Sequence, residues 1–174
     1  MYAAHFVAAL AIKARVPRAP ASALIAGAFL PDFAWIVLAR TGIEPEAPFF
    51  DGWSHSLASI GVEAALFAAL FLRRGRDVAA AMALAVLSHA VLDAPVHPQG
   101  LELYPHARLS LGDGAWSWGQ ARLLGVTQYW WLQLAATAVL LGLYALWRRS
   151  ARIPANLAAA SVVLVLSLHL MNLH

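Results

Sequence analysis

The residues in this sequence best suited to chemistry are His89 and Asp93, which lie four positions apart at the end of a long apolar run. Side chains at positions i and i+4 share one face of a helix, so these two can bind the same metal ion. Pro95 disfavours a continued helix, which places His97 in the following turn, near the pair but not stacked on it. An imidazole and a carboxylate at the end of an apolar helix are unfavourable without a partner, so the pair marks a candidate functional site.

The composition indicates which elements must position this pair. Of the 174 residues, 61% are hydrophobic and 12% are charged, whereas soluble domains carry about a quarter charged residues. We therefore expect an all-α fold, a polytopic membrane bundle of about six transmembrane helices that forms a single domain over residues 1–174. The expected apolar segments are 2–12, 19–39, 54–72, 78–94, 126–147 and 155–173. The absence of cysteine excludes disulfides, zinc–thiolate sites and thiol nucleophiles.

Basic residues indicate the orientation of these segments. The net charge is +3, and nine of the twelve basic residues fall in three alternate loops, 13–18, 73–76 and 148–152. This pattern is typical of membrane topology and not of nucleic-acid binding. By the positive-inside rule these loops are cytoplasmic, so the protein is expected in the cytoplasmic membrane with both termini, the acidic loop 40–53 and the long loop 95–124 facing outward.

This topology brings the candidate ligands to one depth near the outer surface, given the rise of an α-helix. They are His5, Asp32, His55, His89 and Asp93. Nitrogen and oxygen donors without sulfur suit zinc, or alternatively manganese or iron, and the set is large enough for one or two ions. A bound ion would lower the pKa of its water to about 7 and so provide hydroxide for attack on a phosphoryl or acyl centre. Asp51 and His97 are further candidates as ligands or acid–base groups.

Each of these residues also has a structural interpretation. His5 and His55 could be interface histidines at helix ends, Asp32 could pair with a buried histidine in a kinked helix, and His89 with Asp93 could be a structural hydrogen-bonded pair. The alternatives to an enzyme are a carrier of metal ions or protons, with Glu63 and His169 extending the path across the bilayer, and a structural protein with metal-stapled helices.

Several motifs together resemble the bacterial and archaeal membrane-bound metal-dependent hydrolases, which are related to the LexA-binding, inner-membrane-associated hydrolases. The matching pieces, within about residues 1–120, are His5-Phe6, Leu30-Pro31-Asp32, DGWSHSL around His55, SHAVLDAPVHPQGLELYP and LGDGAWSWG. Members of the family often have Arg-Pro-Asp after the histidine that matches His97, where this chain has Pro98-Gln99-Gly100. A looser likeness to zinc-dependent phospholipase C and P1-type nucleases implies phosphoester hydrolysis. The resemblance thus implies a metal-dependent hydrolase. The topology places its site at the outer face, and a site at the membrane interface would reach a lipid or lipid-linked substrate most easily.

Overall fold

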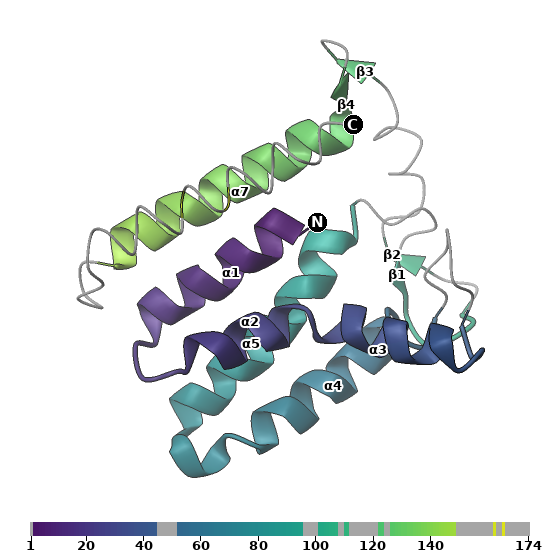
Figure 1. The fold of residues 1–174 in the computed structure, drawn as a ribbon, viewed down its shortest axis with the longest axis horizontal. Coiled ribbons are helices and arrows are strands. Elements are labelled where there is room, and N and C mark those ends of the chain that lie inside the picture. The colour runs from purple at the N-terminus through teal and green to yellow at the C-terminus, as the bar shows by residue number, and fades with distance from the viewer. Residues whose placement is uncertain are drawn as a thin grey trace.

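The protein is all-α within the part of the chain that the computed structural model describes, which is residues 2–44, 52–95, 101–107, 110–111, 122–123, 126–148, 162 and 165. Six α-helices lie in these residues (Figure 1): α1 (Tyr2–Arg15), α2 (Ala21–Ala28), α3 (Leu30–Arg40), α4 (Leu57–Ala69), α5 (Arg76–Asp93) and α7 (Gln128–Trp147). A short 3-10 helix, η1 (Leu72–Arg74), joins α4 to α5.

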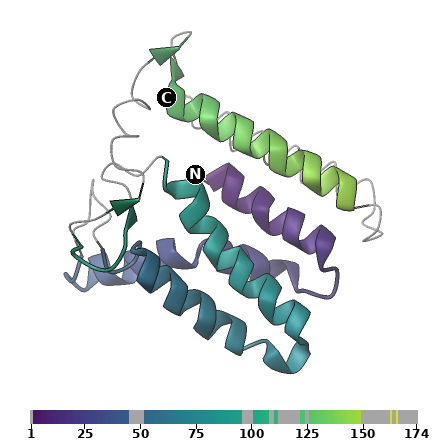
Figure 2. The ribbon, with the colours of Figure 1, turned by 180° about the vertical axis from the view of Figure 1, so that it is seen from behind.

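Helix α1 lies between α7 and a group formed by α2, α4 and α5, as Figures 1 and 2 both show. The core where α1, α2 and α5 meet is built largely from alanines, including Ala9, Ala28, Ala81 and Ala85. Small side chains allow helix backbones to approach closely, as they do in membrane bundles. On its other side, α1 packs through Ala11 and Ala14 against Tyr144 of α7.

The apolar segment 19–39 is divided into two helices, whereas the sequence predicts a single membrane segment there. Helices α2 and α3 meet at Phe29 with a bend of 53°. Pro31 stands at the start of α3 and has no N–H to donate to a preceding carbonyl, so the α2 ladder cannot run on through it. The bend directs the first turn of α3, and with it Asp32, toward the end of α5.

A six-pass bundle is not shown by these helices. Among the described residues, α7 is the one helix long and apolar enough to cross a membrane by itself, and the bent pair α2–α3 brings the count to two at most. Helices α1 and α4 contain 14 and 13 residues, short of the roughly 20 that a straight span needs. The predicted sixth segment, 155–173, lies outside the described residues except for two positions, 162 and 165.

Part of the loop predicted over 95–124 is described. Two antiparallel strand pairs lie in this loop and just after it, β1 (Leu101–Glu102) with β2 (Ser110–Leu111), and β3 (Arg122–Leu123) with β4 (Val126–Thr127), which occupies the first two residues of the predicted segment 126–147. Leu101 is buried against Ile60 and Val86, and the carbonyl of Leu103 accepts the N–H of Ala58 at 3.0 Å. These contacts hold residues 101–107 against the beginning of α4.

Candidate metal centre

The five predicted ligands come together at one end of the helices. His5 lies in α1, Asp32 in the first turn of α3, His55 two residues before α4, and both His89 and Asp93 at the end of α5. The three imidazoles are almost fully buried, with exposed fractions of 0% for His5, 2% for His55 and 0% for His89. None of the three rings therefore projects into solvent. Asp51 and His97 lie outside the described residues.

The ligands form two overlapping groups, His5–His89–Asp93 and Asp32–His55–His89. Within each group one nitrogen or oxygen per residue lies within 4.8 Å of the others, so either group could hold a metal ion. In the first group, Asp93 Oδ1 is 3.1 Å from His5 Nε2 and Asp93 Oδ2 is 3.0 Å from His89 Nε2. In the second, Asp32 Oδ1 is 3.6 Å from His55 Nε2 and 3.8 Å from His89 Nε2.

The orientation of His89 is set by the break between α2 and α3. Its Nδ1 lies 2.8 Å from the carbonyl oxygen of Ala28, the last residue of α2. A carbonyl only accepts, so Nδ1 carries the proton that it donates there. In a neutral ring the Nε2 atom then presents a lone pair to the site. The ring also stacks on His5, with centroids 4.2 Å apart and an interplanar angle of 3°.

His55 is oriented by a chain of side chains that ends at Glu44. The hydroxyl of Ser54 donates to Glu44 Oε2 at 2.8 Å, and the Ser54 N–H donates to Glu44 Oε1 at 2.7 Å. Because the hydroxyl proton is used in this way, the Ser54 oxygen accepts from His55 Nδ1, which is 2.8 Å away. A neutral His55 therefore also presents the lone pair of Nε2 to the site. Glu44 and Ser54 are both buried, with exposed fractions of 4% and 0%.

The hydrogen bonds that fix the Nδ1 protons of His89 and His55 make the centre suitable for a cation. The Nε2 atoms of His55 and His89 face each other at 3.3 Å although the Nδ1 proton of each is already donated elsewhere. Two lone pairs this close, beside the carboxylates of Asp32 and Asp93, repel one another unless a proton or a metal ion lies between them. The buried His5 Nδ1, moreover, has no hydrogen-bond partner in the described part of the chain. Imidazole nitrogens and carboxylate oxygens are the ligands that zinc, manganese and iron take in proteins without thiolates.

The sequence did not indicate the residues that orient the two imidazoles. Glu44 falls only within the acidic loop 40–53, and Ser54 is not among the predicted site residues. The adjacency of Ser54 and His55 in the sequence was a usable signal, because metal-ligating histidines commonly donate their second ring N–H to an oxygen. The role of the Ala28 carbonyl depends on the geometry of the helix break: Pro31 indicates that the helix is interrupted but not which carbonyl meets His89.

No protein-family model, no curated protein and no solved structure matches this chain.

Proposed function

We propose that this protein is a membrane-embedded, metal-dependent hydrolase. The observation that carries the proposal is the pair of His55 and His89 Nε2 atoms, 3.3 Å apart, each with its Nδ1 proton donated away from the site. Second-sphere acceptors that fix a histidine tautomer are a regular feature of metal centres. The motif resemblance described above points the same way, and the ion we favour is zinc, with manganese or iron as alternatives.

His5, Asp32, His55, His89 and Asp93 would hold the ion. When bound, it would supply Lewis acidity that activates water and polarises a phosphoryl or acyl oxygen. His89 offers it a single nitrogen, because its Nδ1 already donates to Ala28. The first ion is therefore expected to bind through His89, and a second ion would have to bind without it.

The proposed substrate is a phosphoester of a lipid or a lipid-linked molecule. Among the five ligands, Asp32 is the most exposed, with 22% of its side chain accessible, so substrate would approach from its side. Exposed apolar residues follow it along one face of α3, with exposed fractions of 52% for Phe33, 46% for Ile36 and 61% for Val37. An apolar surface beside a polar centre suits an amphiphilic substrate. Asp51 and His97 remain our proposed acid–base groups.

The location in a cytoplasmic membrane is part of the same proposal. Large apolar side chains are exposed on most helices, for example Leu66 and Leu70 near the end of α4 and Leu146 in α7. Contiguous exposed apolar surface is rare on soluble monomers. The basic residues of α1, η1 and α5 gather at the end of the bundle opposite the ligands, as the positive-inside rule requires of an outward-facing site.

A carrier of metal ions or protons is the second candidate. Glu63 lies within α4, and its Oε2 is buried without a hydrogen-bond partner in the described residues. A buried, unpaired carboxylate oxygen between the two ends of a helix is what a relay across the bilayer would use. His169, the other group that the sequence suggested for such a path, lies outside the described residues.

Elemental analysis of the detergent-purified protein tests the metal centre first. We expect about one to two equivalents of zinc, manganese or iron in the native protein, with loss in the His89→Ala/Asp93→Ala double variant. Asp32→Asn is a milder second variant, since Asp32 is partly exposed. His106→Asn is the matched control, because His106 is an exposed histidine with a φ of 62°, a conformation that asparagine tolerates.

Hydrolysis is then measured on the metal-loaded protein with chromogenic phosphoesters and with phospholipid vesicles. We expect turnover by the native protein and by His106→Asn, and a large loss in Asp32→Asn. Absence of metal from every sample, after purification without chelator and with metal resupplied, would contradict the metal centre. Bound metal without turnover would favour the metal-stapled structural protein, and bound metal with uptake into proteoliposomes would favour the carrier.

A further inference from the structure

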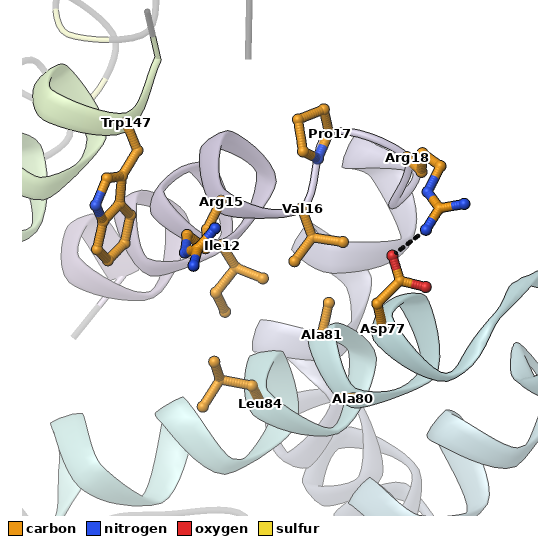
Figure 3. A pocket seen from close by; sticks show the side chains of 10 residues that line it. All are labelled: Ile12, Arg15, Val16, Pro17, Arg18, Asp77, Ala80, Ala81, Leu84 and Trp147. Carbon is orange, nitrogen blue, oxygen red and sulfur yellow. Dashed lines mark hydrogen bonds and ion pairs between the residues drawn. The ribbon is translucent and has the colours of Figure 1, made fainter. Parts of the chain in front are cut away.

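A second candidate site lies at the end of the bundle remote from the ligands. A pocket of about 550 Å³ opens between the end of α1, the first half of α5 and the end of α7. Figure 3 shows the Trp147 indole at one side of this pocket and the ion pair of Arg18 with Asp77 at the other, with Ile12 and Arg15 between them. The pocket is within the size range of small-ligand sites.

The charge of the pocket is positive. Arg18 Nη2 lies 2.6 Å from Asp77 Oδ2, and this hydrogen bond holds the pKa of Asp77 below its ordinary value, so the pair is neutral as a whole. Arg15 is exposed, and no carboxylate among the described residues pairs with it. Arg73 and Arg74 of η1 lie at the same end of the bundle, which raises the positive potential there. The pocket therefore favours an anion, with Arg15 as its direct partner.

The rest of the pocket is apolar and continues along α5. Ile12 and Leu84 form its walls, and Leu84 begins a row of exposed residues, with exposed fractions of 54% for Leu84, 42% for Leu87 and 74% for Val91. Positions i, i+3 and i+7 lie on one face of a helix, so this row forms a continuous apolar strip that leads away from the pocket. Trp147 adds an amphipathic ring of the kind that lies at headgroup level in membranes.

We propose that this pocket binds the phosphate headgroup of an anionic phospholipid, with Arg15 as the partner of the phosphate and an acyl chain along Leu84, Leu87 and Val91. A free anion would use the arginine and leave the apolar strip uncovered, whereas a phospholipid satisfies both. Basic pockets between helices on the cytoplasmic side of membrane proteins have this chemistry. The inference rests on the membrane location proposed above and is independent of the metal centre.

Thermal unfolding in a neutral detergent tests the proposal. Delipidated protein is heated alone, with phosphatidylglycerol, with phosphatidylcholine, and with glycerol phosphate as the soluble anion. We expect phosphatidylglycerol to raise Tm by several degrees, because a ligand that binds the folded state stabilises it, and we expect the other two to leave Tm unchanged. Arg15→Gln should abolish the shift. Arg73→Gln, an exposed arginine at the same end that does not line the pocket, should retain it.

Three outcomes would overturn the proposal. A shift of equal size with glycerol phosphate would indicate a soluble anion as the ligand. An equal shift with phosphatidylcholine, or an undiminished shift in Arg15→Gln, would indicate general solvation by lipid. Metal content measured on the same samples separates the two proposals, since Arg15→Gln leaves all five ligands in place and should bind metal normally.

Discussion

At the scale of single residues, the two facing imidazoles of the candidate metal centre are held by different kinds of acceptor. His89 donates to a backbone carbonyl, which a substitution cannot remove directly, whereas His55 donates to a hydroxyl that is itself fixed by Glu44. The second arrangement can be altered without touching a ligand. A substitution of Glu44 or Ser54 therefore changes how His55 is oriented while His55 itself stays in place.

Glu44→Gln should weaken metal binding without abolishing folding. The amide can donate to Ser54 and reverse the direction of the hydrogen-bond chain, so His55 would no longer be held with its proton on Nδ1. Changes of this kind lower metal affinity about 10- to 100-fold. Competition with a chromogenic chelator measures the affinity.

Glu102→Gln is the control for this experiment, because Glu102 lies in β1 and accepts the backbone N–H of His106, and none of the five predicted ligands hydrogen-bonds to it in the described part of the chain. Equal metal affinities of the two variants would show that Glu44 has no role in metal binding. A loss confined to Glu44→Gln would assign it as a positioning residue.

At the scale of secondary-structure elements, the close approach of α2 to its neighbours places the Ala28 carbonyl beside His89. Gly27 precedes Ala28, and a Cβ atom there would lie 2.8 Å from Phe67 Cε1 and 3.4 Å from the Ala85 Cβ. A distance under 3.0 Å requires a shift of α2 or of Phe67. Gly61 in α4 differs, since a Cβ there would meet nothing within 4 Å.

Gly27→Ala should destabilise the protein even though alanine is the better helix former. Overpacking costs about 1–3 kcal/mol, whereas Gly61→Ala should be neutral or stabilising by up to about 1 kcal/mol. Chemical denaturation in detergent compares the two variants, and metal content shows whether the displaced Ala28 carbonyl affects His89. Equal free energies of unfolding for Gly27→Ala and Gly61→Ala would show that α2 or Phe67 shifts at this contact without an energetic cost.

Sequence patterns predicted the helices better than the breaks and turns between them. The apolar runs around Ile60 and Met82 and the i, i+4 pair His89–Asp93 were placed correctly, because hydrophobic spacing and helix rise are local properties. The expected alternation of segments placed His5 and Asp93 at one depth, but only the structure shows that the two side chains meet. Pro31 indicated a kink near Phe29 but not its angle of 53°, and no pattern predicted the Glu44–Ser54–His55 chain, because both depend on how a turn packs against other elements.

At the scale of the whole molecule, the described helices are polarised. Candidate ligands lie at one end, and at the other lie the basic residues at the ends of α1 and η1. Helix α5 connects the two ends, and its 18 residues rise about 27 Å, close to the thickness of a hydrocarbon core. We predict that the basic end is cytoplasmic.

Reporter fusions test this orientation. Alkaline phosphatase is active only outside the cytoplasm, so we expect activity when it is fused after Tyr104 or after His174 and none when it is fused after Gly75, in the turn between α4 and α5. The reversed pattern of phosphatase activity would place the candidate metal centre on the cytoplasmic side. Activity after Tyr104 without activity after His174 would contradict the proposed number of crossings.

The contact between His5 and Asp93 also bears on the order in which the chain can fold during synthesis. The two residues are 88 positions apart, and they join the first described helix to the end of α5. Until Asp93 has left the ribosome, α1 remains a 14-residue helix whose histidine lacks this partner. Because α1 packs on α5 and α7 as well as on the adjacent α2, its packing is expected to be completed only after those later helices are made. Any protein that inserts or protects the nascent chain would therefore have to retain its first helix while the next four are made.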